Sequence, residues 1–264
     1  MMPRRCNREF TGAPADRKPL DGPGYAYQVT TVGEAVERAV SGEWDLPEFQ
    51  REFVWQPSQV CDLADSLWRN YPIGALLLWR DASGSGDAGS QQWWIADGQQ
   101  RLTSLCLLCG REPAWLRRKP ADYRRRLREQ FDFAFDVGSK GQAGFVAAGP
   151  AAATRDPRLV AVRTLAATDP GSERGRGELA KLAEELARME SCRDLESAEI
   201  HDRLIRVSLI RQRELAVTLV RHERAQVLEI FERLNSRGMR FRRLLLKLAM
   251  EEIPAAIRDL RSRR

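Results

Sequence analysis

A strand, a glycine turn and a helix follow one another without a break between Gln92 and Gly110. The segment Gln92-Trp-Trp-Ile-Ala96 predicts a buried strand, and Asp97-Gly-Gln-Gln-Arg101 comes directly after it. The apolar run Leu102–Cys109 then predicts a helix that Gly110 ends. A junction of this kind requires a fold in which strands and helices pack together.

The flanking segments carry further helix and strand signals. Thr31-Val-Gly-Glu34 is a capping box, so a helix begins there and ends at Gly42. Pro57 suits the first turn of a second helix. Further strands are predicted at 75–79, 131–136 and 214–220, and further helices near 176–190, 196–211, 225–234 and 241–252. The basic segment 111–130 is predicted to become helical towards its end. We expect an irregular extended segment at 46–55 and loops at 81–90 and 138–157.

The composition predicts a cytoplasmic protein without a membrane segment. The longest apolar runs, such as Ala75–Trp79 and Leu244–Leu246, fall far below the ~20 residues that a membrane helix needs. No apolar segment follows the charged N-terminus, so we expect no secretory signal. The 5 cysteines are an odd number scattered through the chain, which argues against a disulfide scaffold and for a reducing compartment.

Two motifs that suggest chemistry do not fit their context, and the scarcity of histidine argues against several others. Gly84–Gly89 matches G-x-G-x-x-G, but it leads into a strand instead of opening a helix, and we interpret it as a hairpin loop. Cys106 and Cys109 form a C-x-x-C pair on an apolar helix, where core packing is the simpler interpretation. The only histidines are His201 and His222, so we expect no zinc, no Ser-His-Asp triad and no His-Asn-His nuclease motif within this chain.

The strand–helix junction has the features of a phosphate site. Asp97 ends the strand, Gly98 permits a tight turn, and the free N–H groups of the following helix attract anions. Arg101 lies in the first helical turn and can bind phosphate oxygens with two donors, while Thr103 or Ser104 adds a hydroxyl. The alternative is an aspartate N-cap followed by polar residues on a solvated helix start.

Two other segments are candidates for the same site. Leu46–Trp55 is rich in aromatic residues and contains Gln50 and Arg51, but its Pro47 argues against a regular strand. The segment Ile230–Gly238 ends a helix in Asn-Ser-Arg-Gly and contributes Asn235 and Arg237. Its alternative is simple helix termination at Gly238.

The ordered set of segments resembles the N-terminal domain of GmrSD-type modification-dependent restriction endonucleases, long filed as a domain of unknown function. The resemblance rests on P-x-F-Q-R-x-F-V-W, Y-P-I-G-x-L-L-L-W, D-G-Q-Q-R-L-T-S-L and F-E-R-L-N-S-x-G, which occur here in the family's order over roughly 45–248. It implies an α+β fold similar to ParB and sulfiredoxin, with a small mixed sheet and helices followed by a mainly helical part. We therefore expect a flexible arm at 1–24, a ParB-like core at 25–140, and a mainly helical region at 141–264 with a returning strand near 214–220.

The resemblance also implies an activity and a set of partners. In that fold a G-x-x-R at a strand–helix junction holds nucleotide phosphates, and here the pattern is Gly98-Gln99-Gln100-Arg101. The D-G-Q-Q-R box of the family is linked to binding and hydrolysis of a nucleoside triphosphate with Mg²⁺, in the service of DNA restriction and phage defence. The family's usual His-Asn-His nuclease domain is not in this chain, so we expect a separate nuclease subunit or a missing C-terminal domain.

The resulting hypothesis is a nucleoside triphosphatase associated with a restriction endonuclease. Arg101 and the helix N-terminus hold phosphates, Asp97 binds Mg²⁺ or positions the attacking water, and Arg51 neutralises developing charge. Gln50, Gln99, Gln100 and Thr103 are further nucleotide-binding candidates, with Asn235 and Arg237 in a second tier. The main alternative is a nucleotide-gated DNA-binding module without turnover. Direct nuclease activity ranks last, because no two-metal carboxylate cluster is evident.

Charge is distributed unevenly along the chain, which suggests a DNA surface. The segments 111–130 and 233–264 carry net charges of +5 and +7, whereas the whole chain carries +6. A basic surface of this kind contacts DNA phosphates without reading sequence. The DNA-binding candidates in the first segment are Arg124, Arg125, Arg126 and Arg128. The alternative is a pair of solvated helix faces in an arginine-rich protein.

Overall fold

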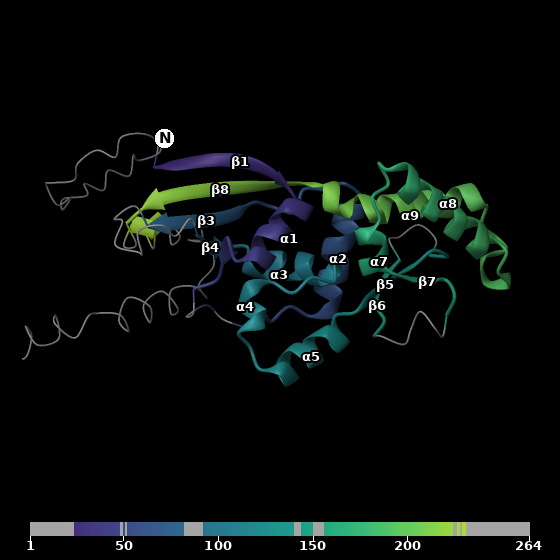
Figure 1. The fold of residues 1–264 in the computed structure, drawn as a ribbon, viewed down its shortest axis with the longest axis horizontal. Helices are drawn as coiled ribbons and strands as arrows, with labels where there is room; N and C mark the ends of the chain where they lie inside the picture. Colours follow the sequence, from purple (N-terminus) through teal and green to yellow (C-terminus); the bar gives the residue numbers. More distant parts are fainter. Residues whose placement is uncertain are drawn as a thin grey trace, which may run out of the picture.

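The structure is a computed structural model that describes residues 24–47, 50, 52–81, 92–139, 144–149, 156–223, 226–227 and 229–230. Several predicted features fall wholly or largely outside the described residues: the N-terminal arm, the loop at 81–90 with its glycine pattern, and the helices at 225–234 and 241–252. Figure 1 draws the described elements with the labels used below.

A five-stranded mixed sheet forms the first part of the fold, in the order β1-β8-β3-β4-β2. Its strands are β1 (Tyr25–Thr31), β2 (Trp44–Asp45), β3 (Leu76–Asp81), β4 (Trp93–Asp97) and β8 (Glu214–His222). The β1–β8 and β3–β4 pairs are antiparallel, whereas β8–β3 and β2–β4 are parallel. The predicted returning strand is thus β8, which lies in the interior of the sheet between β1 and β3 and ties residues 214–222 to the N-terminal strands.

Three helices pack with this sheet: α1 (Val32–Ser41), α2 (Pro57–Trp68) and α3 (Gln99–Leu108). The predicted capping box at α1 is present, because the Thr31 side chain accepts from the Glu34 amide and the Glu34 carboxylate accepts from the Thr31 amide. Gly42 ends α1 with φ 86°, a conformation that favours glycine. The buried residues of α2 recur at the spacing of one helix face: Val60, Leu63, Ala64 and Leu67.

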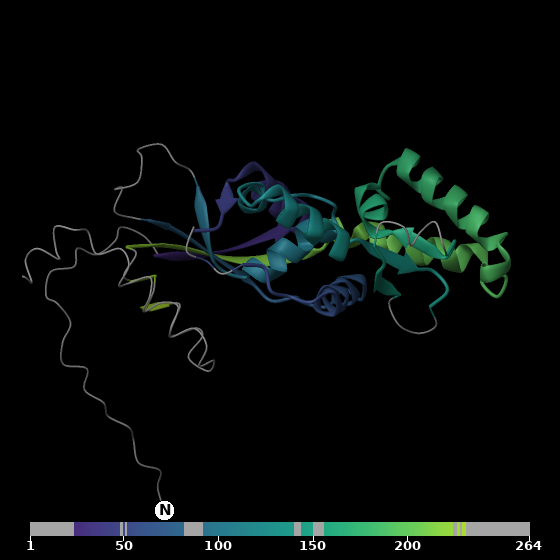
Figure 2. The same ribbon diagram turned by 90° about the horizontal axis from the view of Figure 1, so that it is seen from below.

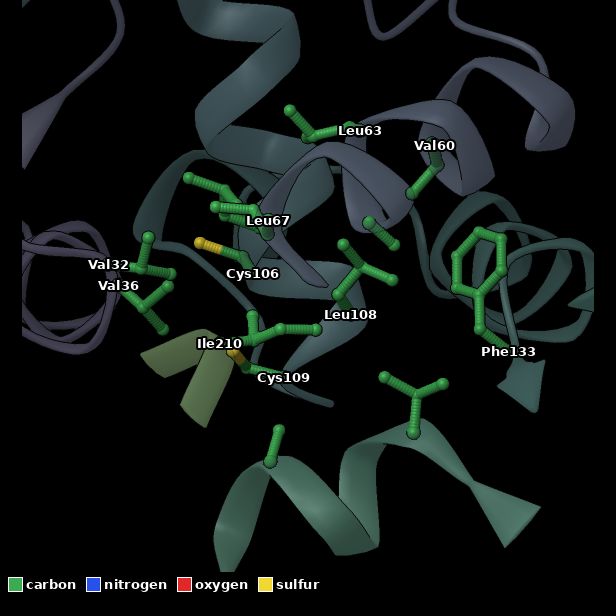
Figure 3. Close-up of a cluster of buried hydrophobic side chains, with 14 of the residues drawn as sticks. Val32, Val36, Val60, Leu63, Leu67, Cys106, Leu108, Cys109, Phe133 and Ile210 are labelled. Carbon is green, nitrogen blue, oxygen red and sulfur yellow. The ribbon is translucent and has the colours of Figure 1, made fainter. Parts of the chain in front are cut away.

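The apolar core continues from these helices into the second half of the chain. Figure 3 shows Cys106 and Cys109 among buried side chains from α1, α2 and the C-terminal half, including Ile210 and Phe133. Burial raises the pKa of the Cys109 thiol to about 11, and it raises that of Cys106 as well. Thiols in this state pack as small apolar groups, in agreement with the core interpretation of the C-x-x-C pair.

A second, antiparallel sheet of order β6-β5-β7 and a set of helices lie together at one end of the molecule (Figures 1 and 2). The strands are β5 (Phe133–Asp136), β6 (Phe145–Ala147) and β7 (Leu159–Ala161). The helices are α7 (Val162–Ala167), α8 (Glu173–Ala187) and α9 (Ser197–Ser208), with short 3-10 turns at Glu190–Cys192 and Leu209–Gln212. Two further helices, α4 (Ala114–Arg117) and α5 (Ala121–Gln130), connect α3 to β5.

The α+β class expected from the sequence is confirmed, and most predicted elements are found within two or three residues of their expected bounds. Six labelled elements were not predicted: β1, β2, α4, β6, β7 and α7. The loop prediction for 138–157 was wrong at β6. This strand has only 3 residues, too few to show an alternating sequence pattern, and it forms because it pairs with β5. No helix in the described ranges is both long and apolar enough to cross a membrane.

Candidate nucleotide site

The candidate site is centred on the turn between β4 and α3. Asp97 is the last residue of β4, and Gly98 is the N-cap of α3 with φ 92°. A Cβ at position 98 would lie 2.3 Å from Cδ2 of Leu76 on the neighbouring strand. Both the backbone conformation and this close packing therefore require glycine, as the turn interpretation predicts.

The side chain of Arg101 turns back from the first turn of α3 towards the end of β4. Its Nη2 lies 3.4 Å from Oδ2 of Asp97, and its Nη1 donates to the carbonyl oxygen of Ile73 at 3.0 Å. It lies next to Gly74, where a Cβ would be 2.7 Å from Nη1. The Arg101 side chain is 19% exposed and that of Asp97 43%, so the guanidinium is held in place while the carboxylate remains open to solvent.

Gln100 points away from the turn and holds the irregular segment that precedes α2. Its Oε1 accepts from the amides of Val54 and Trp55 at 2.9 and 3.3 Å, and its Nε2 donates to the carbonyl of Glu52 at 3.1 Å. The side chain of Gln50 links the same irregular segment to β4: its Nε2 donates to the carbonyl of Ile95 at 2.6 Å. Any contact of Gln100 with a nucleotide would therefore come from its backbone N–H, since its side chain is occupied.

The two hydroxyl residues predicted for the site lie inside the protein. Ser104 Oγ donates to the carbonyl of Gln100 at 2.8 Å, which is an ordinary bond within a helix. Thr103 is fully buried, and its Oγ1 has no hydrogen-bond partner among the described residues. Buried hydroxyl groups in folded proteins are normally hydrogen-bonded to a protein group, an ordered water or a ligand.

A cavity of about 210 Å³ lies beside the first turn of α3. Gln99 and Thr103 contribute to its wall from α3, and Gln50 contributes from the segment before α2. Leu46, Pro47, Glu52 and Phe53 line it from the segment Leu46–Trp55, which the sequence had indicated as a candidate for the site. The remaining lining residues come from the basic segment 111–130 and were not predicted for this site, because their position beside α3 depends on the tertiary fold: Trp115, Leu116, Arg118, Lys119 and Tyr123.

The arginines proposed for DNA binding are largely paired with carboxylates of the same chain. Glu112 binds both Arg124 and Arg128, at 2.9 and 3.0 Å, and Arg126 lies 3.3 Å from Asp122. Arg125 is exposed, and in the described part of the chain it has no ion-pair partner. Other cations of the segment bind acids elsewhere in the chain, in the pairs Arg111–Glu37, Arg118–Asp45 and Lys119–Glu52. The net charge of +5 is thus less available to an external ligand than the sequence suggests.

Comparison with known families identifies the family of the chain. The sequence model of the family described as "GmrSD restriction endonuclease, N-terminal domain" matches residues 32–244. The chain belongs to this family. The resemblance stated from the motifs is thereby confirmed, and membership places the chain in a DNA restriction system directed against phage. No curated protein matched the sequence.

The matched range of this GmrSD family member includes every segment proposed for the site. The structure brings Asp97, Gly98 and Arg101 together, and it places Gln50 and Gln99 at a common cavity. Arg51, Asn235 and Arg237 lie outside the described residues. Within the described ranges, no group of three or more histidine, cysteine, aspartate or glutamate side chains could hold a metal ion.

Proposed function

We propose that this chain is the nucleotide-dependent component of its restriction system, and that it binds and hydrolyses a nucleoside triphosphate at the β4–α3 junction. The observation that carries the proposal is the position of Arg101. Its guanidinium is fixed by the Ile73 carbonyl and by Asp97 beside the first turn of a ten-residue helix. A fixed guanidinium next to a helix N-terminus is a strong arrangement for phosphate recognition.

The phosphates would bind the N–H groups at the start of α3. The first four amides of a helix have no partner within the helix, and they form the positive end of its dipole. Gly98 has no side chain to block the approach of phosphate oxygens to these amides. Arg101 would supply the charged donors, with Gln99 and Gln100 contributing backbone N–H groups.

Asp97 is the residue that fits a magnesium ion at this position. Its carboxylate is partly exposed and lies at the same end of α3 as the proposed phosphate contacts. Mg²⁺ in phosphate sites is commonly held by one or two carboxylates together with the phosphate oxygens and water. One protein ligand is therefore sufficient, in keeping with the lack of a larger acidic cluster among the described residues. When bound, the ion would neutralise charge that develops on the phosphates.

The remaining steps rest on residues of the chain. Asp97 could also orient the attacking water, and Arg51 would neutralise charge that develops during hydrolysis. Asn235 and Arg237 stay as candidates from the segment that follows β8. Hydrolysis would then control a nuclease on a separate His-Asn-His subunit or domain, with DNA as the common substrate.

A nucleotide-gated switch without turnover is the second candidate, and the Asp97–Arg101 pair favours it. The carboxylate that would bind Mg²⁺ and the guanidinium that would bind phosphate are already 3.4 Å apart. A bound nucleotide must compete for both partners, and rearrangement of the pair is the kind of local change that a ligand switch uses. This candidate needs the same site but no chemical step.

Phosphate release from each of the four nucleoside triphosphates, with and without DNA, separates the two candidates. We expect release by the native chain and a loss of about 100-fold or more in Asp97→Asn. Asp65→Asn is the matched control, because Asp65 forms an ion pair with Arg69 at the same i,i+4 spacing on α2, away from the site. Nucleotide binding without release would favour the switch, and no binding of any nucleotide would reject both candidates.

A further inference from the structure

The cavity beside α3 lies on the side of the helix opposite Arg101. Gln99 and Thr103 are one turn apart and share a face, whereas Arg101 is two residues from Gln99 and so about 200° around the helix axis. The N-terminus of α3 lies between the two faces. A ligand whose phosphates bind this N-terminus therefore has Arg101 on one side and the cavity on the other.

The size of the cavity limits what can enter it. Its volume of about 210 Å³ lies below the ~300–1,000 Å³ that is typical of pockets for whole drug-sized ligands. A single planar ring system is the appropriate size, and a complete nucleotide is too large. Phe53, Trp115 and Tyr123 supply aromatic surface, which suits a flat heterocycle.

Two residues that line the cavity each carry a buried polar atom without a partner within the described part of the chain. The atoms are Oγ1 of Thr103 and Nε1 of Trp115, and the residues are 0% and 5% exposed. Gln50 and Gln99 line the same space. Hydroxyl and indole groups beside an aromatic wall can recognise a ring that carries hydrogen-bonding atoms on its edge.

We propose that this cavity takes a nucleobase, and that the base is that of the nucleoside triphosphate whose phosphates bind at Asp97–Arg101. The inference rests on the proposed function, which supplies the phosphate end of the ligand. It extends that function by assigning base selection to Thr103 and Trp115, which line the cavity on the face of α3 opposite Arg101. The same chemistry would also accept a base extruded from DNA, and the experiment distinguishes the two sources.

Thr103→Val and Trp115→Phe each remove one polar hydrogen-bonding group and keep most of the side-chain volume. Trp68→Phe is the matched control, because Trp68 Nε1 is also buried without a partner in the described residues but does not line the cavity. Dissociation constants are measured by titration calorimetry for the four nucleoside triphosphates and for inorganic tripolyphosphate. A DNA duplex with one unpaired base and its fully paired counterpart form the second arm.

We expect the native chain to bind one or two of the four nucleoside triphosphates more tightly than the others. Each cavity variant should weaken the preferred nucleotide by about fivefold, the usual effect of one lost hydrogen bond, and leave tripolyphosphate unchanged. Trp68→Phe should change neither. Equal affinity for all four bases in the native chain, or an equal loss for tripolyphosphate in the variants, would overturn the proposal.

The DNA arm separates a failure of the cavity from a failure of the nucleotide site. If neither nucleotides nor tripolyphosphate bind, the proposed function is wrong. A selective loss of unpaired-base binding in Thr103→Val and Trp115→Phe would then support a nucleobase from DNA as the occupant. If the variants leave both nucleotide selectivity and unpaired-base binding unchanged, the cavity does not bind a nucleobase.

Discussion

The guanidinium of Arg101 lies against the Cα of Gly74, so closely that a methyl group at position 74 would come within 2.7 Å of Nη1. Gly74 belongs to the turn before β3, and it is 27 residues away from Arg101 in the sequence. The adjacent carbonyl of Ile73 accepts a hydrogen bond from the same Nη1. The turn at 73–74 is therefore part of the candidate site, because it fixes the direction in which Arg101 points.

Gly74→Ala should weaken nucleotide binding without changing any residue that contacts the nucleotide. The added methyl group must displace the guanidinium, and we expect the dissociation constant for the preferred nucleotide to rise about tenfold. Position 74 has φ 81°, so the variant also loses about 1–2 kcal/mol of stability from the left-handed backbone conformation. Calorimetric titration and thermal unfolding measure the two effects.

Gly42→Ala is the control that isolates the displacement of Arg101. Gly42 has φ 86°, and its nearest neighbour to an added Cβ is the methyl group of Ala114 at 3.4 Å. It should therefore lose a similar amount of stability and bind nucleotide as the native chain does. Equal weakening in both variants would show that backbone strain, and not the position of Arg101, determines binding.

Gln100 should contribute mainly to stability. Replacement by Met removes the acceptor for the amides of Val54 and Trp55 and leaves these groups without their partner. We expect a loss of about 2 kcal/mol in the free energy of unfolding, measured by urea denaturation, and faster proteolysis near residues 52–56. Gln59→Met is the comparison, because Gln59 accepts from the amide of Gln56 at an exposed position and its loss should have less than half the effect.

The parts of the fold that follow from sequence are those with local signals. Thr31 and Glu34 define the start of α1, and Pro57 the start of α2. Strand β1 was missed because its large apolar residues are on the exposed face: Tyr25, Tyr27 and Val29 are 54%, 79% and 63% exposed. Alternation in β1 therefore does not distinguish a buried face from a solvated one.

The candidate site likewise has one part that local sequence signals predict and another part that they do not. The contact between Asp97 and Arg101 follows from their i,i+4 spacing at a strand–helix junction. The contributions of Gly74, Trp115 and Tyr123 depend on how distant segments pack, and no local pattern reports that. The buried role of Gln100 was also not foreseen, because a polar side chain in a conspicuous motif suggests ligand binding more readily than it suggests a support for a neighbouring loop.

The capping box of α1 should make stability depend on pH in the acid range. The pKa of Glu34 is held below its ordinary value of 4.5, first by the Thr30 hydroxyl, which donates to Oε2 at 2.6 Å, and then by the Thr31 amide. A lowered pKa in the folded state stabilises the protein above the ordinary value, and this contribution is lost as the pH falls through the folded-state pKa. The stability difference between the native chain and Glu34→Gln should therefore shrink on acidification below 4.5.

Thr30→Val tests the cause of this shift directly. It removes the hydroxyl that contributes most to the lowered pKa and keeps the carboxylate. The pKa of Glu34, followed by NMR titration of its side chain, should move up towards 4.5. An unchanged pKa in Thr30→Val would assign the shift to the Thr31 amide instead.

The last prediction concerns Glu112 and the proposed DNA surface. Because Glu112 holds both Arg124 and Arg128, each arginine must give up an ion pair before it can bind a phosphate. Glu112→Gln should release both, strengthen non-specific duplex binding at low salt, and steepen the dependence of log K on log salt by about 0.9 for each added phosphate contact.

Replacing Arg124, Arg125, Arg126 and Arg128 with Gln should flatten the same slope and leave nucleotide hydrolysis intact. Glu173→Gln changes the net charge equally in the first turn of α8, outside the basic segment 111–130, so it shows how much of the effect is general attraction. If Glu112→Gln and Glu173→Gln steepen the slope equally, or if neither changes it, Arg124 and Arg128 do not contact DNA, and the basic segment beyond residue 232 is the surface to test next.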